Sequence, residues 1–138
     1  MSDHLSAAMR ASMSGLTAQS LRMRIASENI ANSQATGATP GSMPYSRKSI
    51  TFASASDDAD IASNVAITSI SRDNSTRVEH RPGHPAADEQ GMVKLPNVDP
   101  LIEMADMREA HRSYLANVQM IRQAREAIAA TIDLLKGS

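Results

Sequence analysis

The sequence predicts a mainly α protein in which long N- and C-terminal helices pair as a coiled coil, with a small irregular β excursion between them. Three observations predict this class. Residues 1–32 and 100–138 contain no proline inside their periodic parts, five of the six prolines fall in residues 33–99, and apolar residues recur every seventh position at both ends. We expect these three segments to form one domain, in which the two terminal helices pair.

The N-terminal segment has the pattern of an amphipathic helix. Met9, Leu16, Met23 and Ile30 recur at a spacing of seven, and Leu5 begins a second row between them. This heptad pattern predicts an apolar stripe for a partner helix. At the end of the helix, we expect an asparagine cap at Asn29 or Asn32, because asparagine tolerates the left-handed backbone conformation needed there.

The central segment alternates between short apolar runs and turn residues. Alternation of apolar and polar residues indicates strands. Glycine and proline in GATPGSMP mark a turn-rich segment, and the polar SASDDADIAS indicates a loop. The expected strands are residues 45–52 and 64–70, with weaker candidates at 76–79 and 92–94, the turn-rich segment is 37–44, and the loop is 54–63.

The C-terminal segment predicts one helix of about 37 residues, a length typical of coiled coils. Asp99 and Pro100 suit the N-cap and first helical positions, and Lys136 followed by Gly137 suits the end. Two heptad rows run along the helix. The first is Met107, Tyr114, Ile121, Ile128 and Leu135, and the second is Met104, His111, Val118, Arg125 and Ile132.

The composition limits the kinds of function. The chain has 138 residues with only two tyrosines and one phenylalanine, so a thick self-sufficient core is not expected. A net charge of −1 disfavours nucleic acid and anionic membranes as partners. The absence of cysteine excludes disulfides and thiolate chemistry. The first 23 residues lack a continuous apolar core, which disfavours a cleaved secretory leader, and no run is long enough for membrane insertion.

A few polar residues could in principle carry chemistry. His80 and His84, with Asp88 nearby, resemble a metal or acid–base cluster, but the prolines around them prevent the helix that would bring the two imidazoles together. His111 could act as a base, although a hydrogen-bonded place at the helix seam explains it better. Arg125 in the same row is expected either to extend its charged end into water or to pair with a carboxylate of a neighbouring helix. We therefore expect an interaction protein, with no enzyme activity, no cofactor and no metal.

Two stretches of the sequence resemble a known family. Residues 28–32 (ENIAN) followed by PYSRK at residues 44–48 resemble the N-terminal signature of bacterial flagellar axial proteins. Residues 84–119, HPAADEQGMVKLPNVDPLIEMADMREAHRSYLANVQ, resemble flagellar basal-body rod proteins of the FlgC type. The resemblance covers both ends of the chain and only loosely residues 53–79, and Met92 stands where the family commonly has an aromatic residue.

The resemblance assigns a set of motif residues. They are Asn29, Ile30, Ala31, Asn32, Tyr45, Arg47, His84, Pro85, Asp88, Gly91, Pro96, Asn97, Val98, Pro100, Glu103, Met104, Tyr114 and Asn117.

The resemblance also implies a function and partners. Proteins of this family are structural subunits of the proximal rod, which spans the periplasm in the flagellar basal body and transmits motor torque. They assemble helically with copies of themselves and with other proximal rod proteins. Further implied partners are the hook–basal body protein that joins the rod to the membrane ring and the flagellar type III export apparatus, which needs no cleaved leader.

The heptad rows then predict the assembly residues. We expect the N-terminal stripe to pack against the first C-terminal row, and the remaining apolar faces, such as Leu21, Ile25 and Leu115, to bury against adjacent subunits. The terminal helices of the isolated chain should be substantially unfolded, because they lack these partners. The expected seam and assembly residues are Leu5, Met9, Leu16, Met23, Ile30, Met104, Met107, Tyr114, Val118, Ile121, Ile128, Ile132 and Leu135.

Two other functions fit parts of the sequence. A coiled-coil adaptor outside the flagellum would have the same helices, and a metal-binding protein would use His80 and His84. The match of residues 84–119 disfavours the adaptor, and the lack of a third ligand at a zinc-like spacing disfavours the metal site.

Overall fold

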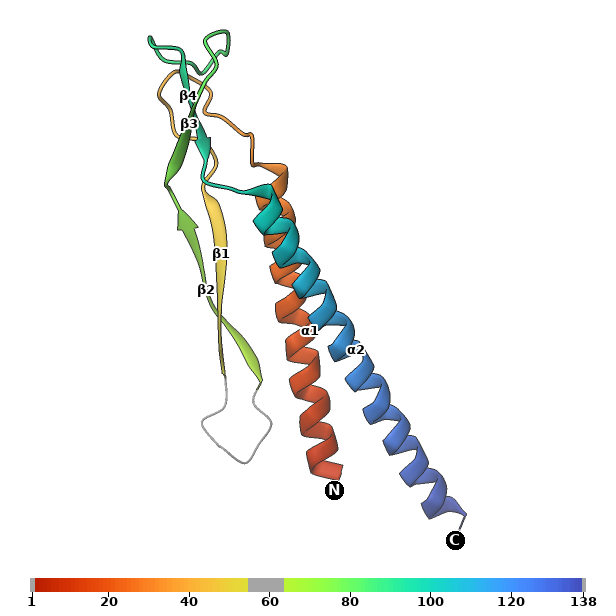
Figure 1. Cartoon of the computed structure of the whole chain (residues 1–138). Coiled ribbons are helices and arrows are strands. Elements are labelled where there is room, and N and C mark those ends of the chain that lie inside the picture. The colour runs from red at the N-terminus through yellow and green to blue at the C-terminus, as the bar shows by residue number, and fades with distance from the viewer. Residues whose placement is uncertain (1, 55–63, 138) are drawn as a thin grey trace. The chain divides into compact units, whose positions relative to one another are not determined.

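The computed structural model describes residues 2–54 and 64–137. Along the sequence, four strands come between one long helix and a second one (Figure 1). The elements are α1 (Ser2–Ala31), β1 (Arg47–Ser54), β2 (Val65–Asp73), β3 (Thr76–His80), β4 (Met92–Pro96) and α2 (Pro100–Lys136). This confirms the mainly α class with a small β region. The expected loop at residues 54–63 lies outside the described residues apart from Ser54, which ends β1.

The contacts divide the chain into two units, each built from parts of both helices. Unit 1 comprises residues 1–22, 51–69 and 108–138, and unit 2 comprises residues 23–50 and 70–107. Within each unit the part of α1 and the part of α2 run in opposite directions (Figure 1). In the part of the chain that the structure describes, neither helix has an apolar run long enough to span a membrane.

The start of α2 is confirmed by its cap. The Leu101 backbone N–H donates to Asp99 Oδ1 over 2.9 Å, and the Glu103 N–H donates to the Asp99 carbonyl over 3.1 Å. Pro100 follows at the first helical position, where its missing N–H leaves no hydrogen bond unmade. The helix ends at Lys136, where the sequence places its end.

The end of α1 differs from the expected cap. The described non-glycine residues, Asn29 and Asn32 among them, all keep a negative φ, so the expectation of a left-handed asparagine was wrong. Asn32 instead satisfies the helix end through its side chain, because its Nδ2 donates to the Glu28 carbonyl over 2.8 Å. Asn29 lies inside the helix and points away from its end, into the interior of unit 2.

All four expected strands are present. β1 pairs with β2, and β3 pairs antiparallel with β4, with Thr76 opposite Pro96 and His80 opposite Met92. Within unit 2 the hydroxyls of Ser49 and Ser71 lie 2.7 Å apart across the first pair. Because most side chains of β2 are exposed, this strand gains little from burial within the chain.

The largest buried side chains belong to unit 2. Val93, Leu95 and Pro96 of β4 have almost no exposed surface, and Ile25 of α1 is buried as well. Gly91, with φ of 77°, makes the turn into β4, where a Cβ would lie 2.9 Å from Pro82 Cβ. Unit 2 therefore has a compact apolar centre, and Ile25 belongs to it, which corrects the expectation that Ile25 faces a neighbouring subunit.

Unit 1 buries mainly small side chains where its two helices meet. A Cβ at Gly15 would lie 2.8 Å from Asn117 Nδ2, so the helices approach closely at this point. Such close approach excludes bulky side chains and buries little apolar area per residue. The buried residues of unit 1 are Ala7, Ser12, Gly15, Ala18, Ala110 and Ala124.

Candidate functional site

A buried polar junction joins three elements of unit 2 around Asn29. The Asn29 side chain is fully buried and makes four hydrogen bonds. Its Nδ2 donates to the Lys48 carbonyl over 2.8 Å and to Glu103 Oε2 over 3.1 Å. Its Oδ1 accepts from the Lys48 N–H and from the Tyr45 hydroxyl, both over 2.9 Å. Because Asn29 belongs to α1 and its partners belong to β1, to the segment just before β1 and to α2, Asn29 fixes the register of the three elements in unit 2.

Charged groups complete this junction. The Glu103 carboxylate is nearly buried and accepts from Arg47 Nε over 2.6 Å, which balances its charge. Lys48 Nζ pairs with Glu28, and this hydrogen bond lowers the pKa of Glu28. Burial raises the pKa of the Tyr45 hydroxyl, which donates to Asn29 Oδ1. Every charge of the junction therefore has a partner of opposite sign.

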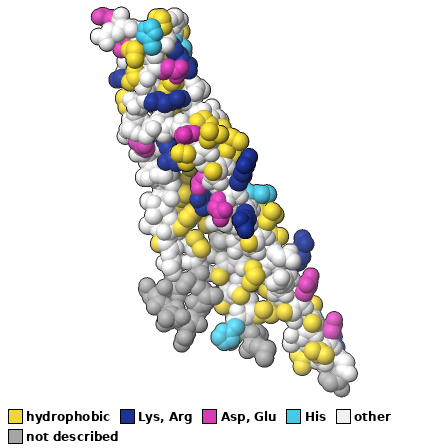
Figure 2. All heavy atoms as spheres, viewed as in Figure 1, with side chains coloured by type: hydrophobic (Ala, Val, Ile, Leu, Met, Phe, Trp, Pro, Cys, Tyr) yellow, Lys and Arg dark blue, Asp and Glu magenta, His cyan; other side chains and the backbone are white. Residues whose placement is uncertain are grey.

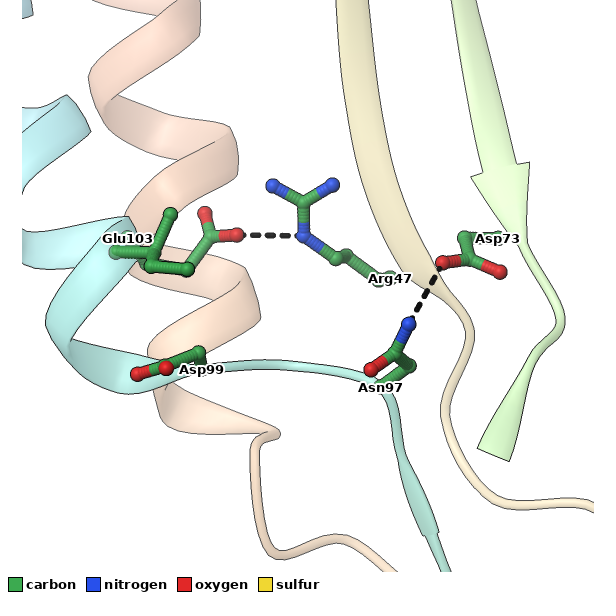
Figure 3. Close-up of a pocket in the computed structure, with 6 residues that line it drawn as sticks. Arg47, Asp73, Asn97, Asp99 and Glu103 are labelled. Carbon is green, nitrogen blue, oxygen red and sulfur yellow. Dashed lines mark hydrogen bonds and ion pairs between the residues drawn. The ribbon is translucent and has the colours of Figure 1, made fainter. Parts of the chain in front are cut away.

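A hollow of about 270 Å³ lies beside the junction, lined by Arg47, Asp73, Asn97, Asp99, Ile102 and Glu103 (Figure 3).

The polar groups that line this hollow bind one another. Asp73 accepts from Ser75 and from Asn97 Nδ2, and these hydrogen bonds lower its pKa. Asp99 caps α2, and Glu103 binds Arg47 (Figure 3). A carboxylate held in this way is a poor general base or nucleophile, because its lone pairs and charge are already engaged. The hollow is therefore best explained as part of the support for the start of α2.

The histidine candidates have structural surroundings. His84 Nδ1 accepts from the Ala86 N–H over 3.1 Å, and His80 lies in β3 close to Gly91. The Asp88 carboxylate accepts from the backbone N–H groups of Gln90 and Met92 and so shapes the turn before β4. Within residues 2–54 and 64–137, no group of three histidine or acidic side chains is placed to hold a metal ion.

The two heptad rows of α2 differ in their burial within the single chain. Met107, Tyr114, Ile121 and Ile128 are partly buried, whereas Leu135 is exposed. A second inward-facing row runs through Glu103, Ala110, Asn117 and Ala124, one residue before each member of the second heptad row.

The shift has a physical reason. The sequence argument followed bulky apolar residues, but closely spaced helices select small ones for their contact. Of the expected second row, Val118 is partly buried, while Met104, His111, Arg125 and Ile132 are exposed. Their part in assembly stays a prediction.

The expected stripe of α1 lies at the margin of the buried surface. Leu5, Met9, Leu16, Met23 and Ile30 are all partly buried. The fully buried positions beside them are the small residues already described for unit 1. The inward-facing row of α2 could have been found in the sequence, because Ala110, Asn117 and Ala124 recur at a spacing of seven.

Large apolar side chains instead lie on the surface of α2. Leu101 is 75% exposed and Leu134 is 77% exposed, although both lie in a regular helix. Figure 2 shows apolar side chains on the surface of the molecule, interspersed with charged ones. Exposed apolar surface of this extent marks an interaction site. The other exposed members on α2 are Ile102, Met104, Leu115, Met120, Ile132 and Leu135.

The motif residues serve mainly unit 2. Asn29, Tyr45, Arg47 and Glu103, which are far apart in the sequence, meet at the junction. Others shape the turns and the end of β4: Asp88, Gly91, Pro96, Asn97, Val98 and Pro100. Lys48 lies in the PYSRK stretch but was not among the assigned motif residues. Its backbone and side chain both join the junction, and backbone hydrogen bonds leave no signal in a residue pattern.

Comparisons with known proteins match both ends of the chain. Residues 9–39 match the family model "Flagella basal body rod protein", and residues 89–134 match "Flagellar basal body rod FlgEFG protein C-terminal". The chain is 56% identical over 137 residues to the flagellar basal-body rod protein FlgC of Agrobacterium fabrum, covering 99% of both chains. It is 36% identical to FlgC of Borreliella burgdorferi and 31% identical to FlgC of Bacillus subtilis, covering 92% and 96% of those proteins and 89% and 93% of this chain.

Proposed function

The chain belongs to the flagellar basal-body rod proteins of the FlgC type, and from this premise we propose how its surfaces build the rod. It is a structural subunit of the proximal rod of the bacterial flagellar basal body. The neighbours that we propose are copies of this chain and other proximal rod proteins, with the hook–basal body protein at the membrane ring. The flagellar type III export apparatus would deliver the subunit.

The exposed apolar side chains of α2 carry this proposal. Burying one leucine, isoleucine or methionine side chain stabilises a contact by about 1.5–3 kcal/mol. Leu101, Leu115 and Leu134 are each more than half exposed and offer this gain to a neighbouring subunit. Subunits joined by contacts between two different surfaces form an open helical filament when the contacts do not close into a ring.

Torque transmission needs no chemical step in this arrangement. Many coupled interfaces pass a twist along the filament if each subunit keeps its shape. The junction at Asn29 supplies such stiffness, because its buried hydrogen bonds hold α1, β1 and α2 together in unit 2. No catalytic role is required of the carboxylates beside it, which bind Arg47, Ser75 and Asn97.

A pair of substitutions on α2 tests the proposal. Leu115→Asp places a charge on an exposed apolar position, and Thr131→Asp places the same charge on an exposed polar position of the same helix. Neither should unfold the chain. In cells that lack their own rod subunit, Leu115→Asp should abolish incorporation into basal bodies and motility, because an unpaired carboxylate in an apolar contact costs several kcal/mol.

The matched variant separates the effect of the position from the effect of an added charge. Thr131→Asp should support motility close to that of the unchanged chain. Normal motility of Leu115→Asp would contradict the assignment of the apolar surface to assembly. Failure of the unchanged chain to enter basal bodies would contradict the function itself.

A further inference from the structure

The charges of α2 are divided between two surfaces in unit 1. Residues spaced alternately three and four apart along a helix lie on one side of it. One such series, which we call the basic flank, contains three arginines and one lysine but no acidic residue. Its members are Arg108, His111, Leu115, Val118, Arg122, Arg125, Ala129, Ile132 and Lys136.

The neighbouring series has the opposite charge. It contains Glu109, Glu126 and Asp133 with a single cation, Arg112, and we call it the acidic flank. All of its members are exposed, and so are those of the basic flank except the partly buried Val118. The complete acidic flank is Glu109, Arg112, Ala116, Gln119, Gln123, Glu126, Ala130 and Asp133.

The charged groups of both flanks lack partners within the described chain. The ion pairs of Arg47, Lys48 and Arg81 all lie elsewhere, in unit 2. No hydrogen bond or ion pair of the described residues joins a charged side chain of the basic flank to one of the acidic flank. The two flanks therefore keep their opposite charges for another molecule.

The flanks also match in size. The basic flank has the larger apolar side chains, Leu115, Val118 and Ile132, whereas the acidic flank has Ala116 and Ala130 between its charges. Large side chains pack closely against a helix surface at positions where the facing residues are small. Two copies of the basic flank would bring arginines together, and two copies of the acidic flank would leave the leucine and isoleucine in water.

We propose that the basic flank of α2 packs against the acidic flank of α2 in a second copy of this chain, an inference that rests on the proposed function. The contact uses a different surface on each copy, so it continues from subunit to subunit. Because all subunits then share one orientation, neighbouring α2 helices are parallel. Charge complementarity selects this pairing over the two symmetric ones.

The positions of the charges set the register of this contact. With a rise of about 1.5 Å per residue, Arg108 lies level with Glu109, and Arg125 lies level with Glu126, to within one residue. Lys136 is within one helical turn of Asp133 on the same scale. Parallel helices with almost no axial offset thus bring three charge pairs together, with Leu115 opposite Ala116. This contact alone joins copies side by side at one level, and the rise along the rod comes from other contacts.

Cysteine cross-linking tests the geometry, and the chain is suited to it because it has no cysteine of its own. Leu115→Cys and Ala116→Cys are made in separate copies and expressed singly or together in the same cells. We expect disulfide-linked dimers only when the two variants are expressed together. Dimers of Leu115→Cys alone would overturn the proposal, since they require two basic flanks to face each other.

Charge reversal tests the electrostatic part. Arg125→Glu reverses the basic flank, and Arg112→Glu makes the same change on the acidic flank. Arg125→Glu should lower the yield of the cross-link between positions 115 and 116 about fivefold, as expected for loss of about 1 kcal/mol at an exposed pair. Arg112→Glu should keep or raise the yield. Equal losses in both variants would overturn the proposal.

Restoration by a second reversal gives the sharpest outcome. Glu126→Lys alone should lower the yield as Arg125→Glu does. When the copy carrying Cys at 115 has Arg125→Glu and the copy carrying Cys at 116 has Glu126→Lys, the yield should return. Cross-links from position 115 only to a different protein would also overturn the copy-to-copy contact. If motility and incorporation are normal while these cross-links are absent, this inference fails and the rod function stands.

Discussion

Replacement of Asn29 by alanine is the strongest test of the junction in unit 2. The substitution removes a fully buried side chain and four hydrogen bonds, to Lys48 N–H, the Lys48 carbonyl, the Tyr45 hydroxyl and Glu103. Three of these bonds join neutral groups and are worth about 1 kcal/mol each, and the one to the carboxylate is worth about 2 kcal/mol. Their sum, about 5 kcal/mol, is an upper value because the contributions overlap.

We expect Asn29→Ala to lower the free energy of unfolding by about 3–5 kcal/mol. The measurement is urea denaturation of the purified chain followed by far-ultraviolet circular dichroism. Hydrogen exchange at the Lys48 amide gives a local reading, because its N–H donates to Asn29 Oδ1 and should exchange much faster in the variant.

Asn32→Ala is the matched control for this substitution. Asn32 lies three residues further along the chain, and its side chain makes one hydrogen bond to the described residues, to the Glu28 carbonyl. Its replacement should lower the free energy of unfolding by only about 1 kcal/mol. Equal effects of the two substitutions, or an unchanged Lys48 amide in Asn29→Ala, would refute the assignment of Asn29 as the centre of the junction.

Three further predictions concern the helices and their charges. Gly15→Val should destabilise unit 1 by about 1–3 kcal/mol in thermal unfolding, because a Cβ there meets Asn117, and adding Asn117→Gly should restore part of the loss. Asp99→Ala removes the N-cap of α2 and should lower the free energy of unfolding by about 1 kcal/mol in urea. Lys48 lowers the pKa of Glu28 below its usual 4.5. This ion pair therefore stabilises the fold above pH 4.5, and its contribution is lost as the pH falls through the lowered pKa. Lys48→Met should weaken this acid dependence of the free energy of unfolding, measured in urea titrations.

The helices could be predicted closely because their signals are local. Heptad periodicity, the proline at residue 100 and the aspartate before it define where α2 begins, and the structure places its start at the same residue. The strands were predicted for the same reason, since alternation and turn residues are read from neighbouring positions.

The contact surface of the helices could not be predicted as well. A pattern of bulky apolar residues indicates which side of a helix avoids water, but it does not distinguish a partner in the same chain from one in another chain. At Gly15 and Ala110 the distance between the two helices determines which residues form the contact. This distance depends on residues far apart in the sequence. Bulky residues from which a heptad row was predicted, such as Met104 and Ile132, are exposed in the single chain.

The junction shows the same limit. Asn29 was noted for its place near a helix end, where a capping role needs only local sequence. Its actual partners, Lys48 and Glu103, lie 19 and 74 residues away. The resemblance to the rod family grouped Asn29 with Tyr45, Arg47 and Glu103, but only the structure explains the group, as one set of hydrogen bonds.

Electron cryomicroscopy of basal bodies that contain this chain tests the central claim most directly. The claim is that the apolar residues exposed on α2 form a core shared between subunits. In the assembled rod, Leu101, Leu115 and Leu134, now more than half exposed, should be buried against neighbouring chains. A rod map in which these side chains face water, with subunits joined through other surfaces, would contradict the claim.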